Sequence, residues 1–280
     1  MHNAAFAALG LDWCYLAFEV APEHLGTAIQ GAQAMDFAGL NLTVPHKIMA
    51  LDLVDALDES ALTWGAVNTI RFEGRGTDGA WRRLSEFAAA DAEGPVARRT
   101  QGFNTDADGI SRSLREDLGI ELRGQRVLLL GAGGAGRTIA LKLAAEEVAE
   151  LFLVNRTRSK AEELAAEIKL RFPAVAVTVG HPPAAVDLLI NATSLGLKPA
   201  DALPLDLDRF PLARARAVYD TIYRPATTPL LAAAQAAGGR TANGLGMLLH
   251  QGAAAFEIWT GRSAPVAVMR QALEQSIYGR

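Results

Sequence analysis

The pattern of apolar and polar residues predicts alternating helices and strands along the first hundred positions. Residues 40–44 have a two-residue period, which is typical of a strand with one buried face. Pro45 ends that strand, because proline cannot donate a ladder hydrogen bond. Similar patterns predict strands at 12–20, 38–44 and 66–72 and helices at the start of the chain, at about 23–35 and at 47–57.

Strands and helices alternate again from about residue 104 onward. Residues 126–130, R-V-L-L-L, are a short continuous apolar run, as in a parallel sheet that is covered on both faces. Further strands are predicted at 151–154, 175–179, 187–192 and 217–222, and helices at 106–118, 135–148, 159–170, 245–259 and 265–278. Strands separated by helices predict a doubly wound parallel sheet.

The fold class is therefore α/β with two domains. A small α/β domain is expected over 1–103, completed by the C-terminal helices in 245–280, and a Rossmann-type domain over 104–244. Hinges are expected near 102–106 and 238–244. Residues 73–100 are rich in glycine, proline and mixed charge, so we expect a surface excursion with a helical turn or two within 81–90 and with Arg98 and Arg99 facing solvent.

The composition of the chain excludes several classes of protein. The 280 residues include 27 basic and 31 acidic side chains, well mixed, which argues against a nucleic-acid or anionic-membrane surface. Cys14 is the only cysteine; this excludes an internal disulfide and suits a reducing cytosol. We expect Cys14 to be a small core side chain in strand 12–20. No apolar run approaches membrane-spanning length, and the histidines share no metal-ligand spacing, so no metal is expected.

A glycine-rich turn follows the strand at 126–130. Gly131, Gly133 and Gly136 have G-x-G-x-x-G spacing and lie between a buried strand and a helix. In that context the first glycine allows the tight turn, the second lets the backbone approach a pyrophosphate, and the third lets helix and strand pack closely. The helix N-terminus supplies partial positive charge. The pattern predicts a dinucleotide site.

The end of the next strand indicates which dinucleotide binds. NAD sites carry an acid there for the ribose hydroxyls, but this chain has Asn155, Arg156 and Thr157, followed by Arg158 and Lys160. Guanidinium and ammonium groups favour a 2′-phosphate through charge-assisted hydrogen bonds. Cations are unfavourable at the start of a helix, which is further reason to expect an anionic ligand. The cofactor is predicted to be NADP.

Candidates for catalysis lie at strand ends outside the nucleotide domain. They are Thr43 and Lys47 in N-L-T-V-P-H-K, Asn68 in G-A-V-N-T, and Asp106 in G-F-N-T-D-A-D-G. Open α/β sheets bind ligands at the carboxyl ends of their strands, so Lys47 and Asp106 are expected to converge on one cleft.

Seven stretches together resemble one known family, the shikimate dehydrogenases. They occur in the family's order and cover nearly the whole chain: N-L-T-V-P-H-K, G-A-V-N-T, N-T-D-A-D-G, G-A-G-G-A-G, N-R-T-R-S-K, I-N-A-T-S-L-G and N-G-L-G-M-L-L-H-Q-G. The resemblance implies an NADP-dependent enzyme of aromatic amino-acid biosynthesis that reduces 3-dehydroshikimate reversibly to shikimate by hydride transfer. A cytoplasmic monomer or homodimer with a small-molecule substrate is expected.

The resemblance also implies residue roles. Lys47 and Asp106 would form the catalytic pair. The substrate would be held by Thr43, Lys47, Asn68, Asp106, Tyr223 and Gln251, although Tyr223 could equally be a loop anchor. Together with the glycine turn and the following strand end, the resemblance gives this cofactor-binding set: Gly131, Ala132, Gly133, Gly134, Ala135, Gly136, Asn155, Arg156, Thr157, Lys160, Thr193 and Gly244.

The chemistry of the pair is consistent with this role but leaves one alternative open. Oxidising a secondary alcohol requires removal of the hydroxyl proton as hydride leaves the same carbon. Lys47 can accept that proton if its pKa is lowered, or stabilise the alkoxide if it stays charged. A neighbouring carboxylate orients the lysine but opposes a lowered pKa. The sequence does not choose between these forms.

The chain departs from the family at its start. The family normally begins with a buried strand and an S-x-S motif that binds the substrate carboxylate, whereas this sequence opens with M-H-N-A-A-F-A-A-L-G, which resembles the middle of the first helix. A clipped start is expected, with an open position beside strand 38–44; a true start at Met1 is the alternative. Quinate or another polyol acid as substrate, and an inactive NADP-binding homologue, stay open as alternative functions.

Overall fold

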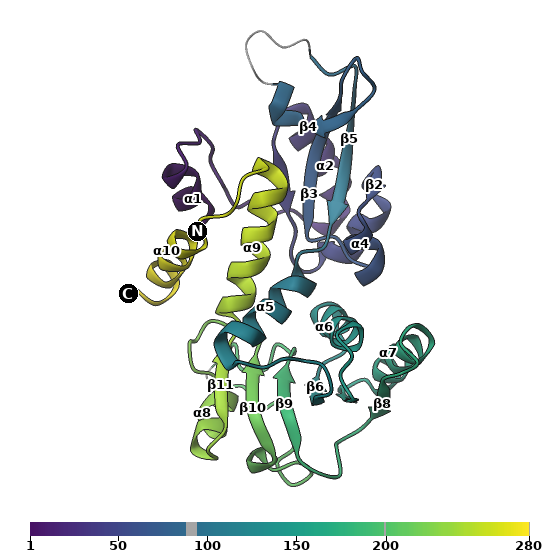
Figure 1. Ribbon diagram of the computed structural model, residues 1–280, viewed down its shortest axis with the longest axis vertical. Helices are drawn as coiled ribbons and strands as arrows, with labels where there is room; N and C mark the ends of the chain where they lie inside the picture. The colour runs from purple at the N-terminus through teal and green to yellow at the C-terminus, as the bar shows by residue number, and fades with distance from the viewer. Residues whose placement is uncertain (88–93, 199, 280) are drawn as a thin grey trace. The chain divides into compact units, whose positions relative to one another are not determined.

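Two sheets organise the chain in the computed structural model, which describes residues 1–87, 94–198 and 200–279 (Figure 1). The chain divides into two compact units. The first unit comprises Met1–Thr105 and Gly252–Ala272, and the second unit comprises Asp106–Gln251 and Leu273–Arg280. A mixed sheet lies in the first unit and a parallel sheet in the second. The α/β class expected from the sequence is confirmed.

The first unit is built on a five-stranded mixed sheet of order β1-β3-β5-β2, with β4 paired to β3. Its strands are β1 (Gly39–Asn41), β2 (Ala56–Leu57), β3 (Thr69–Arg75), β4 (Trp81–Arg83) and β5 (Ala97–Phe103). Its helices before residue 105 are α1 (His2–Ala8), α2 (Leu25–Ala34), α3 (His46–Met49) and α4 (Glu59–Trp64), with 3-10 turns at Pro22–His24, Ala50–Asp52 and Leu84–Phe87.

Alternation along β3 decides which residues fill the core of the first unit. Ile70 and Phe72 are fully buried and pack with Leu25 and Ile29 of α2. The strand has a second contact through its backbone, because the indole nitrogen of Trp259 donates to the carbonyl of Ile70 at 2.9 Å. Trp259 belongs to α9 (Leu245–Thr260), so the C-terminal part of the chain completes this unit.

Two predicted elements near the start are wrong. Residues 12–20 form no strand, and Cys14 is exposed rather than a core side chain. The predicted helix at 47–57 is only the single turn of α3 followed by a 3-10 turn, because the chain enters β2 at Ala56. Among the described residues β1 pairs with β3 and has no strand on its other side. The clipped start stays a prediction.

The excursion at 73–100 is more regular than expected. β3 continues to Arg75, β4 returns beside it, and β5 runs antiparallel to β3 over seven residue pairs from Thr69↔Phe103 to Arg75↔Ala97. A 3-10 turn at Leu84–Phe87 takes the place of the first part of the helical turns predicted within 81–90, and residues 88–93 lie outside the described part of the chain.

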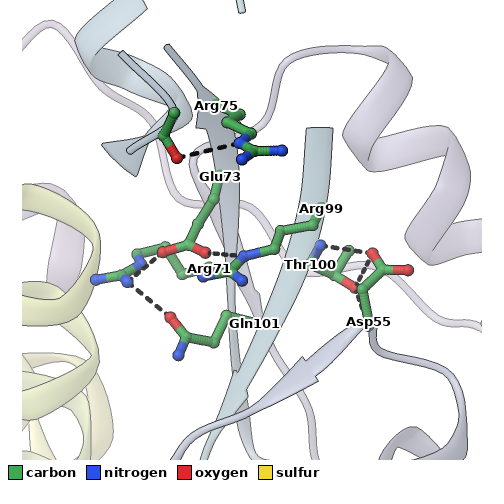
Figure 2. A network of polar contacts seen from close by, with 8 residues as sticks. Asp55, Arg71, Glu73, Arg75, Arg99, Thr100 and Gln101 are labelled. Atoms are coloured by element: carbon green, nitrogen blue, oxygen red, sulfur yellow. Dashed lines mark hydrogen bonds and ion pairs between the residues drawn. The ribbon is translucent and has the colours of Figure 1, made fainter. Parts of the chain in front are cut away.

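A buried carboxylate links the two long strands (Figure 2). Glu73 is 1 % exposed and lies opposite Arg99, whose Nε donates to it at 2.6 Å. Arg71 donates to the other carboxylate oxygen, and to Gln101, its own cross-strand partner, at 2.7 Å. The guanidinium of Arg99 also lies over the ring of Trp81. Arg99 is therefore a structural residue that is only half-buried, with 28 % of its side chain exposed.

The second unit contains a six-stranded parallel sheet of order β11-β10-β9-β6-β7-β8. Its strands are β6 (Arg126–Leu130), β7 (Glu150–Val154), β8 (Ala176–Val179), β9 (Val186–Asn191), β10 (Ala215–Asp220) and β11 (Arg240–Asn243). Its helices are α5 (Asp106–Leu118), α6 (Gly134–Ala145), α7 (Arg158–Arg171) and α8 (Pro229–Ala236), together with the first part of α9; α10 is Val266–Tyr278.

The parallel sheet is covered on both faces, as its apolar strands predict. Residues 127–130 of β6 and 188–191 of β9 are buried without interruption. α6 and α7 pack along β6, β7 and β8, while α8 packs along β10 and β11. The predicted strands and helices of this unit are confirmed to within a few residues; β11 and α8 were not predicted. None of the helices described in the chain is long and apolar enough to cross a membrane.

Removing the charge of Glu73 should destabilise the first unit. Glu73→Gln leaves Arg71 and Arg99, which are 22 % and 28 % exposed, facing each other without a carboxylate. We expect the free energy of unfolding to fall by about 2–3 kcal/mol, the range for lost hydrogen bonds to charged groups. Urea unfolding followed by circular dichroism measures it.

A nearby exposed pair provides the control. Arg98 also lies on β5 and pairs with Asp36 at the surface, where the two side chains are 39 % and 62 % exposed. Arg98→Gln should cost less than about 1 kcal/mol, since exposed ion pairs contribute little. Equal losses for the two variants would contradict a special role for Glu73.

Candidate active site

Three candidate residues of the first unit lie on adjoining segments. The amide of Leu42 donates to the carbonyl of Asn68 at 2.8 Å, and the amide of Val67 donates to the carbonyl of Lys47 at 2.8 Å. These bonds dock the turn after β1 and the single turn of α3 against the residues that precede β3. The structure thus brings Thr43, Lys47 and Asn68 together. Thr43 is exposed, Lys47 half-buried and Asn68 buried.

Asn68 also fixes the residue before Asp106. Its Nδ2 donates to the hydroxyl of Thr105 at 2.9 Å, and its Oδ1 accepts from the amide of Thr105 at 2.9 Å. Asn41 supports the backbone at the same place, since its Nδ2 donates to the carbonyl of Asn68 and to the hydroxyl of Thr69. Sequence reasoning did not assign roles to Asn41 and Thr105, although both lie inside the recognised motifs.

Two candidates of the second unit are brought together by a close helix crossing. A Cβ at Gly109 of α5 would lie 3.1 Å from the carbonyl oxygen of Met247 and 3.2 Å from the Cβ of Gln251 on α9. Glycine therefore allows the two helices to touch. Asp106, 7 % exposed, begins α5 one turn before that crossing, and Gln251 is half-buried beside it. Gly109, the glycine of D-A-D-G, thus allows the helices that carry Asp106 and Gln251 to come close together.

The glycine turn fits a pyrophosphate. Gly131 has φ +104°, and a Cβ there would lie 2.9 Å from the carbonyl of Ala192; a Cβ at Gly136 would lie 2.2 Å from the carbonyl of Gly131. These two glycines are required by the fold itself. A Cβ at Gly133 would meet no atom within 4 Å, so this position faces open space. No side chain caps the start of α6, and its first turn has no acid, which leaves amide groups for an anion.

The strand end at Asn155 supports the glycine turn and carries the cations. Asn155 Oδ1 accepts from the amide of Ala132 at 3.0 Å, and its Nδ2 donates to the carbonyl of Thr157 at 2.8 Å. Arg158 pairs with Glu162 along α7. Within the described residues Arg156 and Lys160 make no ion pair, and the first turn of α7 contains no acid. These two exposed cations fit a phosphate group.

The remaining candidates lie on turns that follow β9, β10 and β11. The amide and the hydroxyl of Thr193 both donate to Asn191 Oδ1, at 3.0 and 2.7 Å. Gly244 follows β11, and a Cβ there would lie 2.0 Å from the carbonyl of Thr221. Tyr223 is 37 % exposed, and its carbonyl accepts from the hydroxyl of Tyr278. Substrate binding by the hydroxyl of Tyr223 stays a prediction.

One buried acid at this edge was missed. Asp220, the last residue of β10, is fully buried and accepts from Asn191, Thr228 and the amide of Ile222. Burial raises the pKa of its carboxyl group above the ordinary value, and these hydrogen bonds oppose the rise. In residues 1–87, 94–198 and 200–279 no group of three or more His, Cys, Asp or Glu side chains is placed to hold a metal ion.

Family models match three parts of the chain. Residues 1–70 match the shikimate dehydrogenase substrate binding domain, residues 113–195 the shikimate / quinate 5-dehydrogenase model, and residues 244–274 the shikimate 5′-dehydrogenase C-terminal domain.

Two curated relatives are named shikimate dehydrogenase (NADP(+)). The protein of Methanopyrus kandleri is 41 % identical over 98 % of this chain and 89 % of its own, and that of Moorella thermoacetica is 42 % identical over 99 % and 88 %.

Solved structures share the whole fold. A shikimate dehydrogenase in complex with NADP+ is 34 % identical, with a TM-score of 0.80 over 99 % of this chain and 89 % of that chain. A 5-ketofructose reductase of Gluconobacter is 35 % identical (TM-score 0.77; 98 % and 91 %), and a quinate dehydrogenase of Corynebacterium glutamicum in complex with NAD is 30 % identical (TM-score 0.77; 96 % and 91 %). The chain belongs to the shikimate dehydrogenase family, and the resemblance and the two-domain Rossmann-type fold expected from the sequence are confirmed.

The open space at Gly133 yields a prediction that separates folding from binding. Gly133→Ala introduces no clash and has an ordinary φ of −80°, so the melting temperature should stay unchanged. The added methyl group should meet the bound pyrophosphate and weaken NADP+ by about 1–3 kcal/mol, the cost of overfilling a packed site. Calorimetric titration with NADP+ measures it.

Gly136→Ala is the matched comparison. Its Cβ would meet the carbonyl of Gly131, so this variant should melt at a lower temperature. Undiminished NADP+ binding by Gly133→Ala would contradict a phosphate cradle at this turn.

Proposed function

We propose that the chain is an NADP-dependent shikimate dehydrogenase that interconverts 3-dehydroshikimate and shikimate. The observation that carries this proposal is near-full-length identity of about two residues in five to several curated NADP-dependent shikimate dehydrogenases. The geometry supports it, because Thr43, Lys47 and Asn68 lie on adjoining segments of the first unit, while Asp106 and Gln251 lie on helices that touch at Gly109. When bound, the nicotinamide donates or accepts the hydride.

Lys47 and Asp106 are the proposed catalytic pair. The ammonium group of Lys47 can donate to the substrate oxygen while negative charge develops on it, and can exchange the hydroxyl proton. Asp106 is buried at the start of α5, where the helix N-terminus stabilises a carboxylate. A carboxylate in that position can accept from a substrate hydroxyl and keep it oriented.

The other substrate groups are proposed to orient the ring. Thr43 and Asn68 supply a hydroxyl and an amide from the first unit, while Tyr223 and Gln251 supply a phenol and an amide from the second. Neutral donors and acceptors suit a polyol, since each hydroxyl needs both a donor and an acceptor for full pairing.

The cofactor set is proposed to act in two places. Backbone amides of residues 132–135, at the start of α6, would hold the pyrophosphate. Arg156, Thr157 and Lys160 would hold the 2′-phosphate, while Asn155 keeps the strand end against the glycine turn. Thr193 and Gly244 would border the nicotinamide half, at the carboxyl ends of β9 and β11.

Quinate is the alternative substrate, because proteins of similar fold are named for substrates other than shikimate. The quinate dehydrogenase and the 5-ketofructose reductase have the same TM-score of 0.77 against this chain. Initial rates with shikimate and with quinate, each with NADP+ and NAD+, distinguish the candidates. Preference for quinate would replace the proposed substrate, and absence of any turnover with NADP+ binding intact would favour an inactive homologue.

We propose a cytoplasmic monomer or homodimer whose partner is a small molecule rather than nucleic acid or membrane, on the basis of the mixed charge and the single cysteine. Light scattering after size-exclusion chromatography measures the oligomeric state.

Replacing Lys47 should affect turnover more than binding. Lys47→Ala is expected to lower kcat by about 10²–10⁴, the usual contribution of a positioned acid–base group, with a smaller change in KM for shikimate. Added small primary amines should restore part of the rate. Lys169→Ala removes an exposed lysine in the last turn of α7 and should leave both constants unaltered. A Lys47→Ala variant with full turnover would exclude the role.

Replacing Arg156 should discriminate between the two nucleotides. Arg156→Ala is expected to weaken NADP+ by about 1.5–3 kcal/mol, the range for a hydrogen bond to a charged group, and to leave NAD+ almost unchanged. Arg158→Ala is the control, because Arg158 is already paired with Glu162. Equal losses of NADP+ and NAD+ affinity in Arg156→Ala would remove the proposed phosphate contact.

A further inference from the structure

Three neighbouring strands of the parallel sheet end on polar residues in one row. Asp220 is the register partner of Asn191 on β9 and of Asn243 on β11. Residues paired in this way point to the same face of a sheet. Asp220 is the middle member of the row and is fully buried.

Both oxygens of Asp220 are used by the turns that leave the sheet. Oδ1 accepts from Asn191 Nδ2 at 3.0 Å and from the amide of Ile222 at 3.1 Å. Oδ2 accepts from the hydroxyl of Thr228 at 2.6 Å. Thr228 in turn caps the start of α8, where its hydroxyl accepts from the amide of Leu231. One carboxylate therefore holds both ends of the 221–228 turn.

The same carboxylate reaches the turn after β9 through Asn191. The amide group of Asn191 is fully engaged: its nitrogen also donates to the carbonyl of Leu195 at 3.2 Å, and its oxygen accepts from the amide and hydroxyl of Thr193. An amide side chain that is held by Asp220 has one orientation. In that orientation its oxygen faces the amide and the hydroxyl of Thr193.

We propose that Asp220 is a positioning residue that fixes the cofactor-side turn at Thr193 relative to the substrate-side turn at Tyr223. Tyr223 follows directly on Ile222, whose amide Asp220 holds and whose carbonyl accepts from Gly244. The roles of Thr193 and Tyr223 rest on the proposed function. In this proposal Asp220 acts only through its hydrogen bonds to the two turns and contacts neither the substrate nor the cofactor.

Two substitutions at Asp220 separate geometry from charge. Asp220→Ala removes every acceptor, and we expect kcat/KM for shikimate to fall about 10²-fold, with KM for NADP+ raised, because a displacement of about 1 Å costs that much. Asp220→Asn keeps an acceptor for Asn191 and Ile222 and places an amide against Thr228, so its loss should stay below about tenfold. An Asp220→Asn variant as poor as Asp220→Ala would overturn the geometric role.

Thr228 and Val186 supply the matched controls. Thr228→Val removes the donor to Oδ2 and should reproduce part of the loss, while Thr228→Ser keeps the hydroxyl and should restore the rate. Val186→Ala lowers packing at the buried amino end of β9, far along the strand from Asn191, and should lower the melting temperature without changing kcat or KM. Unchanged kinetic constants in Asp220→Ala, below its melting temperature, would overturn the proposal.

A binding measurement keeps this proposal separate from the proposed function. Calorimetric titration with NADP+ should show weaker binding by Asp220→Ala than by Asp220→Asn, whatever substrate the enzyme uses. If the starting protein binds NADP+ but does not oxidise shikimate, the proposed function fails while the positioning role is still tested. Equal NADP+ affinity in the two variants and the starting protein would overturn the positioning of the Thr193 turn.

Discussion

Parallel strand register is the constraint on which the second unit depends. Because β6, β9, β10 and β11 run in the same direction and pair without slip, Leu130, Asn191, Asp220 and Asn243 end at one edge. In the second unit, the turns that carry Gly131, Thr193, Tyr223 and Gly244 leave from that edge. A one-residue slip would move each of these side chains to the opposite face. The apolar strands that fill the core thus also determine where the candidate residues of these turns lie.

Close backbone contact is the second constraint, and glycine supplies it in several places. Gly136 touches the carbonyl of Gly131, Gly244 touches that of Thr221, and Gly109 lets α5 meet α9. At these points the glycine is required whether or not a ligand binds. Gly133 differs, since open space surrounds it. A glycine pattern in a sequence therefore mixes positions needed by the fold with positions needed by a ligand, and only coordinates separate them.

The sequence predicted the second unit better than the first for a physical reason. Parallel strands buried on both faces are continuous apolar runs, so β6 was located residue for residue. In the first unit the same alternation at 12–20 was taken for a strand, but an alternating segment forms a strand only beside a partner, and Leu16 and Phe18 are exposed instead. The hairpin strand β4 was missed because its three residues, Trp81–Arg83, are too few to show an alternating pattern.

The candidate residues themselves were readable from the sequence, whereas their supports were not. Thr43, Lys47 and Asn68 lie in short motifs, but the amide of Asn41 and the hydroxyl of Thr105 that hold Asn68 become visible only through their contacts. The same is true of Asp220, which has no motif of its own. Asn68 is held by an amide and a hydroxyl group, and the turns around Asp220 are held by its buried carboxylate. The hydrogen bonds in both places have a fixed direction. The ion pairs around Glu73 hold β3 against β5, whereas we expect orientation at the site to depend on the hydrogen bonds made by Asn68 and Asp220.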